Sequence, residues 1–172
     1  MIKGVFEVFK LASSQGSDEN KAAFLKQNES FAIRTVLQGA FHPGIKFLLP
    51  EGEPPFQVND PVSVETRLHS LVKKLDMFIE GGRPIASQSK REMLFIEMLE
   101  SVHPDDAKIL LNMKDKKDPW PGITHNVAHL AFPELIPAPE VPPQQEPFRE
   151  IPELVEEAST EKKKPARKKK VV

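Results

Sequence analysis

The chain has 172 residues, its 24 Lys and Arg are balanced by 25 Asp and Glu, and it contains no cysteine. This length accommodates one domain with an extension. The lack of cysteine excludes disulfides, thiol nucleophiles and iron–sulfur clusters, fits a reducing cytoplasm, and limits any metal site to His, Asp and Glu. No apolar run approaches the roughly 20 residues that cross a bilayer, and we find no export signal, so we expect no membrane association.

Helical periodicity dominates the first 132 residues. Near the N-terminus, apolar residues recur at positions i, i+3, i+4 and i+7 from Ile2 to Phe9, which predicts an amphipathic helix. Ser17 is expected to cap a second helix that ends near Asn28. Ser30 is expected to cap a third helix, which the His42-Pro43-Gly44 turn ends.

A connector and a fourth helix come next. Residues 49–56 contain three prolines and one glycine, which predicts a stiff, irregular loop. After this loop, apolar residues alternate in steps of four and three and predict a helix of about four turns, with a stripe made of Val64, Leu68, Leu71, Leu75 and Phe78. Gly81-Gly82 is typical of the left-handed end of such a helix.

Capping signals predict three more helices. Ser89 and Glu92 match a capping box for a helix that contains Met93, Phe95, Ile96 and Leu99. Pro104 stands at the expected first turn of a helix to about Lys114, with Asp105 and Asp106 at its positive end. Thr124 is expected to cap a last short helix to Phe132. No strand pattern competes, so we predict an all-α, compact bundle of about six to seven short helices over residues 1–136.

From residue 137 to residue 172 the composition changes to that of a Pro-rich, charge-segregated tail. Eight of the 17 prolines lie in the last 40 residues, and eight acids precede a dense basic block. We predict that this tail is disordered or extended, apart from a short helical turn near residues 152–158. The basic block is a candidate for weak, non-specific binding to nucleic-acid phosphates, or it only solubilises the chain; its cations are Lys162, Lys163, Lys164, Arg167, Lys168, Lys169 and Lys170.

The folded part offers few candidates for a binding site. Trp120, between two prolines, either anchors a partner or, in the interpretation we favour, fills the edge of its own core. His125 and His129 are spaced i, i+4 and could form half of a metal site, but an exposed histidine pair is the commoner outcome, so we predict no metal and no cofactor. Basic residues such as Lys73, Lys90 and the Lys114–Lys117 run form either a phosphate-contacting surface or an ordinary solvated face.

No catalytic motif stands out. The sequence has no Gly-x-Ser-x-Gly elbow, no Walker loop and no Gly-x-Gly-x-x-Gly. A nucleophile, a base and oxyanion donors cannot all be assigned, so we predict that the protein is not an enzyme and has no catalytic residues.

Three blocks of sequence resemble a conserved hypothetical family of large tailed bacteriophages of the T-even type, especially those of marine cyanobacteria. The blocks are residues 31–41 continuing into 46–52, residues 91–104, and the Lys114-Asp115-Lys116-Lys117 run leading to Gly122-Ile123-Thr124 and Ala131-Phe132-Pro133. The resemblance covers roughly residues 18–137. It implies a setting, the cytoplasm of an infected bacterial host or the virion, and no mechanism.

Two functions are compatible with these features. In the first, which we favour, the protein is an accessory interaction protein whose helical domain docks on a phage or host protein while its basic tail tethers it to nucleic acid. In the second, it is a virion-associated or structural protein whose tail only solubilises it or contacts packaged DNA.

Overall fold

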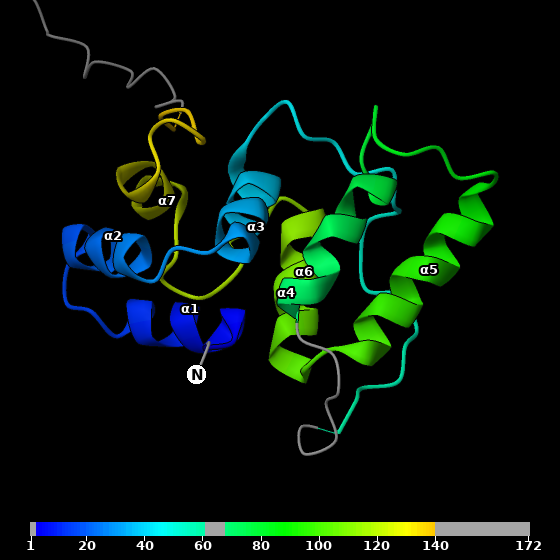
Figure 1. Ribbon diagram of the computed structural model, residues 1–172, viewed down its shortest axis with the longest axis horizontal. Helices are drawn as coiled ribbons and strands as arrows, with labels where there is room; N and C mark the ends of the chain where they lie inside the picture. The colour runs from blue at the N-terminus through cyan, green and yellow to red at the C-terminus, as the bar shows by residue number, and fades with distance from the viewer. Residues whose placement is uncertain (1–2, 61–67, 140–172) are drawn as a thin grey trace, which may run out of the picture. The chain divides into compact units, whose positions relative to one another are not determined.

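A computed structural model describes residues 3–60 and 68–139 of the chain. In this part the protein is all-α, with seven α-helices, one 3₁₀ helix and no strand (Figure 1). The predicted all-α bundle is therefore confirmed. The predicted tail, beyond residues 137–139, and all seven of its candidate cations lie outside the described residues.

Three short helices pack together beside the third helix of the chain, α3 (Phe31–Phe41). These are α1 (Val5–Ser13), α2 (Asp18–Gln27) and α7 (His125–Ala131), and α2 contacts both of the others (Figure 1). Asn126 on α7 donates a hydrogen bond of 3.3 Å to the Asp18 carboxylate at the start of α2. Hydrogen bonds from Lys21 and Asn126 hold the pKa of Asp18 below its ordinary value.

Three of the four predicted serine and threonine caps are confirmed. Ser17 and Ser30 accept hydrogen bonds from backbone amides in the first turns of α2 and of α3 (Phe31–Phe41), at 3.3 and 3.2 Å. Thr124 does the same for α7 at 3.4 Å. Each hydroxyl satisfies one of the amides that a helix start leaves without a partner.

The prediction of one α-helix of about four turns after the proline-rich loop is wrong, because most of this segment is a 3₁₀ helix. An α-helix of only four residues, α4 (Leu68–Leu71), continues as a 3₁₀ helix, η1 (Val72–Phe78), and residue 64 lies outside the described part. A 3₁₀ helix has three residues per turn, so Val72, Leu75 and Phe78 stand in one row, whereas an α-helix would rotate them by about 60° at each step. All three are buried, and the described part of the stripe does face the core as predicted.

Helix α5 (Gln88–Ser101) begins earlier than predicted. Ser87, not Ser89, caps it by accepting a hydrogen bond of 3.2 Å from the amide of Lys90. Glu92 therefore does not close a capping box; it accepts instead from the Gln88 side chain at 2.8 Å. Before this helix, Gly81 has φ 79°, which agrees with the predicted left-handed position.

Helix α6 (Pro104–Lys114) lies at the centre of the described fold and contacts α1, α3 and α5. Its apolar side chains Ile109, Leu110 and Met113 are fully buried. Phe78 and Phe95 meet edge to face beside it, with ring centroids 5.4 Å apart. No helix among the described residues is long and apolar enough to cross a bilayer.

Candidate functional site

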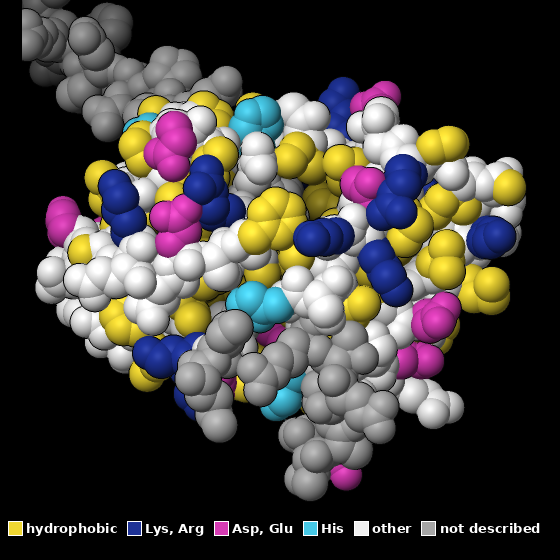
Figure 2. Space-filling model, in the orientation of Figure 1, with side chains coloured by type: hydrophobic (Ala, Val, Ile, Leu, Met, Phe, Trp, Pro, Cys, Tyr) yellow, Lys and Arg dark blue, Asp and Glu magenta, His cyan; other side chains and the backbone are white. Residues whose placement is uncertain are grey.

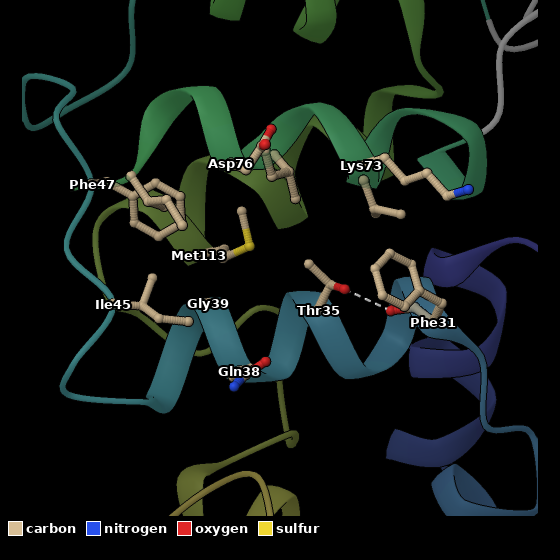
Figure 3. Close-up of a pocket in the computed structure, with 12 residues that line it drawn as sticks. Phe31, Thr35, Gln38, Gly39, Ile45, Phe47, Lys73, Asp76 and Met113 are labelled. Carbon is tan, nitrogen blue, oxygen red and sulfur yellow. Dashed lines mark hydrogen bonds between the residues drawn. The ribbon is translucent and has the colours of Figure 1, made fainter. Parts of the chain in front are cut away.

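An apolar groove of about 430 Å³ lies between α3 and η1. Hydrophobic side chains gather in this hollow on the face shown in Figure 2, with basic and acidic side chains beside them. We call it the α3 groove and define it by its lining residues, which are Phe31, Thr35, Gln38, Gly39, Ile45, Phe47, Val72, Lys73, Leu75, Asp76, Ile79 and Met113 (Figure 3).

The floor of the groove depends on one glycine. A Cβ atom at Gly39 would lie 2.7 Å from the Met113 sulfur, which is far inside van der Waals contact. Glycine therefore lets α3 approach α6 closely, with the Met113 side chain lying between the two walls (Figure 3). At one end, Phe47 and Ile79 form an isolated antiparallel bridge that joins the 45–47 segment to the end of η1.

Two polar side chains of the groove, Thr35 and Asp76, already have partners within the chain. The Thr35 hydroxyl donates to the Phe31 carbonyl at 2.7 Å. Both carboxylate oxygens of Asp76 accept hydrogen bonds from Arg83, each at 2.7 Å, and this pairing holds the pKa of Asp76 below its ordinary value. Lys73 is exposed, and within the described ranges no carboxylate forms an ion pair with its ammonium group. The groove therefore combines an apolar surface with one positive charge that no carboxylate of the described residues pairs with.

A large aromatic side chain stands at the end of the groove. Phe31 is 61% exposed although it is the first residue of a core helix. Phe31, Thr35 and Gln38 are spaced i, i+4 and i+7, so they form one ridge along α3. A second hollow follows the other side of this ridge, where Arg34 is paired with Glu29 at 2.6 Å. The sequence does carry a signal for this ridge, because Phe31 falls outside the helical period of the buried residues and its i+4 and i+7 neighbours are polar.

The Lys114–Lys117 run proves largely structural. Lys116 Nζ donates hydrogen bonds to the carbonyls of Gly39 and His42, at 2.6 and 3.0 Å, and so caps the end of α3; burial lowers the pKa of its ammonium group. Lys114 is buried, pairs with Asp115 and donates to the Pro50 carbonyl at 2.8 Å. Lys114 therefore does not face solvent, and Lys116, although exposed, has its ammonium group bonded to two carbonyls; the two side chains hold α3 and the proline-rich loop on α6.

The histidine pair holds the chain that follows α7. His125 Nε2 lies 2.9 Å from the Pro137 carbonyl, and His129 Nδ1 lies 2.8 Å from the Ile136 carbonyl. A carbonyl only accepts, so each of these ring nitrogens carries the donated hydrogen. Within residues 3–60 and 68–139, no three potential metal ligands come together. Trp120 is half-buried and packs against the core, while its suggested role in partner binding stays a prediction.

Comparison with known proteins places the chain in a family. The model of a family of unknown function, DUF6433, matches residues 8–118. The chain belongs to this family. The matched range includes every residue that lines the α3 groove, together with the Lys114–Lys117 run that holds α3 in place. No curated protein matches the chain, and no solved structure does.

Proposed function

We propose that the protein is a non-enzymatic accessory interaction protein of a T-even-type tailed bacteriophage. Its helical domain docks on a protein partner in the cytoplasm of the infected host, and its basic tail holds it weakly and non-specifically on nucleic acid. The α3 groove is the observation that carries this proposal. An exposed phenylalanine beside an open apolar trough is the kind of surface that protein interfaces use as an anchor.

The groove suits recognition better than catalysis. Its one carboxylate, Asp76, has both oxygens committed to Arg83 and is poorly placed to act as a general base. Thr35 donates its hydroxyl hydrogen to its own helix rather than to a neighbouring base, so it is not an activated nucleophile. Apolar contact, with the charge of Lys73 beside it, is what remains for this surface to offer.

The tail supplies the proposed tether. Seven cations between Lys162 and Lys170 gain free energy by releasing counterions from a phosphate backbone. They lack a scaffold that would aim them at base edges, so binding should be insensitive to sequence and micromolar or weaker near physiological salt. Preceding acids, including Glu156, Glu157 and Glu161, compete for the same lysines and weaken the binding further.

A DNA titration at two salt concentrations tests the tether. The full chain is compared with a version that ends at Glu161. If all seven cations engage duplex DNA, the logarithm of the binding constant should fall with the logarithm of salt at a slope near −6, and near −3 if half of them engage. The shortened version should lose the binding. Equal affinity of the two proteins, or no binding by either at low salt, would remove the tether from the proposed function.

A further inference from the structure

The α3 groove restricts the chemistry of the partner that it accepts. This inference rests on the proposed function, because it concerns the same docking surface. We propose that the groove receives an amphipathic α-helix of another protein, whose apolar face lies along the groove and whose edge carries a carboxylate that pairs with Lys73.

The shape of the groove favours a helix. One wall is α3, whose 11 residues extend about 16 Å, or three helical turns, and the opposite wall is η1. A helix lying between them would present apolar side chains at positions i, i+3 or i+4, and i+7. The trough is open along one side, so part of any ligand stays in water. The polar face of an amphipathic helix tolerates this exposure, whereas an acyl chain would lose much of the burial that drives its binding.

The charges at the rim favour an acidic partner. Asp76 is neutralised by Arg83, and on the other side of the α3 ridge Arg34 and Glu29 neutralise each other. Among the residues that the structure describes, Lys73 is left as the charge on the groove wall without an ion-pair partner. A carboxylate on the partner gains attraction there, while a lysine at the same place is repelled. The preference should show mainly in discrimination between partners, because an exposed pair adds little affinity.

Phe31 gives the docking its apolar anchor. Its ring is largely in solvent, and it stands on the ridge between the two hollows, where a partner helix can cover it. Burial of an aromatic side chain contributes more to binding than any other contact that this surface offers. Removal of the Phe31 ring should therefore weaken every helix that uses the groove, whatever its charge.

Two synthetic 15-residue helical peptides test the proposal on the full-length protein. Both carry leucines at i, i+3, i+7 and i+10; one has glutamates flanking the leucines and the other has lysines at those positions. Binding is followed by amide chemical shifts of α3 and η1 at low salt. We expect the glutamate peptide to bind about three- to tenfold tighter than the lysine peptide. Lys73→Glu should reverse that order.

Lys90→Glu is the matched control, because Lys90 is an exposed lysine in the first turn of α5 and does not line the groove. It should leave the order of the two peptides unchanged. Phe31→Ser should weaken both peptides at least fivefold with an unchanged melting temperature. If both peptides bind equally to the parent protein but lose affinity in Phe31→Ser, the acidic preference is wrong and the docking groove stands. If neither peptide shifts the groove amides at 1 mM, or if Phe31→Ser has no effect, the groove is not a helix-docking site, and the docking half of the proposed function fails with it.

Discussion

The backbone amide of Phe6 donates a hydrogen bond of 3.1 Å to the carboxylate of Asp106, 100 residues away in the sequence. Asp106 is only 4% exposed and lies in the first turn of α6, so one carboxylate joins the starts of α1 and α6. The Phe6 ring stacks on His103, the residue that caps α6, with ring centroids 4.1 Å apart, which adds a second contact between the starts of the two helices. Burial raises the pKa of Asp106 to about 6.

This raised pKa predicts that the contribution of Asp106 to stability falls as pH rises. Between about pH 4 and pH 6 the folded protein keeps a proton on Asp106 that the unfolded chain has lost, so the contribution of Asp106 to the free energy of unfolding decreases through this window, by roughly 3 kcal/mol when complete. Asp106→Asn removes the free-energy cost of burying an ionised carboxylate, and its side-chain amide oxygen can still accept the hydrogen bond from the Phe6 amide. In urea unfolding, we expect this variant to be more stable than the parent by roughly 3 kcal/mol at pH 7.5 and by roughly 1 kcal/mol at pH 4.5.

Asp105→Asn is the control for this experiment. Asp105 is the neighbouring acid of α6, but its side chain is 32% exposed and pairs with Lys108 at the surface. Loss of that charge should change stability by less than about 1 kcal/mol, because it removes the pair with Lys108 but also removes a repulsion that helps to raise the pKa of Asp106; any gain at high pH should therefore be much smaller than that of Asp106→Asn. An Asp106→Asn protein less stable than the parent at pH 7.5 would show that the two helix starts favour the ionised carboxylate enough to outweigh its burial.

The apolar stripe of α4 and η1 gives a prediction about the core. Leu71 is 8% exposed, so Leu71→Ala should lower the free energy of unfolding by about 2 to 5 kcal/mol. Met93→Ala on α5 is the comparison, because Met93 is 61% exposed and its truncation should cost less than about 0.5 kcal/mol. Chemical denaturation of both variants measures the difference. Similar small losses in the two would mean that the stripe does not pack as tightly as its burial indicates.

Local signals predicted most of the helices, and contacts between distant residues explain what was missed. Ser17, Ser30 and Thr124 each bond to an amide three residues away, so their caps can be identified from neighbouring residues alone. The burial of Asp106 could not be predicted in this way, because its hydrogen-bond partner, the amide of Phe6, is 100 residues away in the sequence. The α3 groove was missed for the same reason: its floor depends on the fit of Gly39 to Met113, and its charge depends on the pairing of Asp76 with Arg83.

The histidine contacts predict a local effect on the segment after α7. His129→Leu removes the hydrogen bond to the Ile136 carbonyl and leaves that acceptor unpaired, which should cost about 1 kcal/mol. A Glu-specific protease should then cleave after Glu134 faster than in the parent protein. Leu130→Ala, at a 46% exposed position on the same helix, should leave the cleavage rate unchanged. Unchanged cleavage in His129→Leu would mean that the buried side chain of Ile136 holds the segment without the histidine.

The cap that Lys116 places on α3 gives the last prediction. Lys116→Met keeps most of the apolar stem but removes both hydrogen bonds to the Gly39 and His42 carbonyls, and it should cost about 1 to 3 kcal/mol. Lys116 also has φ 56°, a left-handed conformation that strains any residue with a Cβ atom. Lys116→Gly loses the same two hydrogen bonds but relieves this strain, so it should be more stable than Lys116→Met by roughly 1 kcal/mol.

Lys117→Met serves as the control, because the Lys117 side chain is 69% exposed and lies 3.9 Å from Asp115; it should cost less than about 0.5 kcal/mol. Amide exchange in the last turn of α3 locates the effect: both Lys116 variants should speed exchange there, and Lys117→Met should not. Unchanged exchange in this turn of Lys116→Met would mean that Lys116 does not cap α3. Within the Lys114–Lys117 run, only Lys114, through its hydrogen bond to Pro50, would then hold another part of the described fold in place.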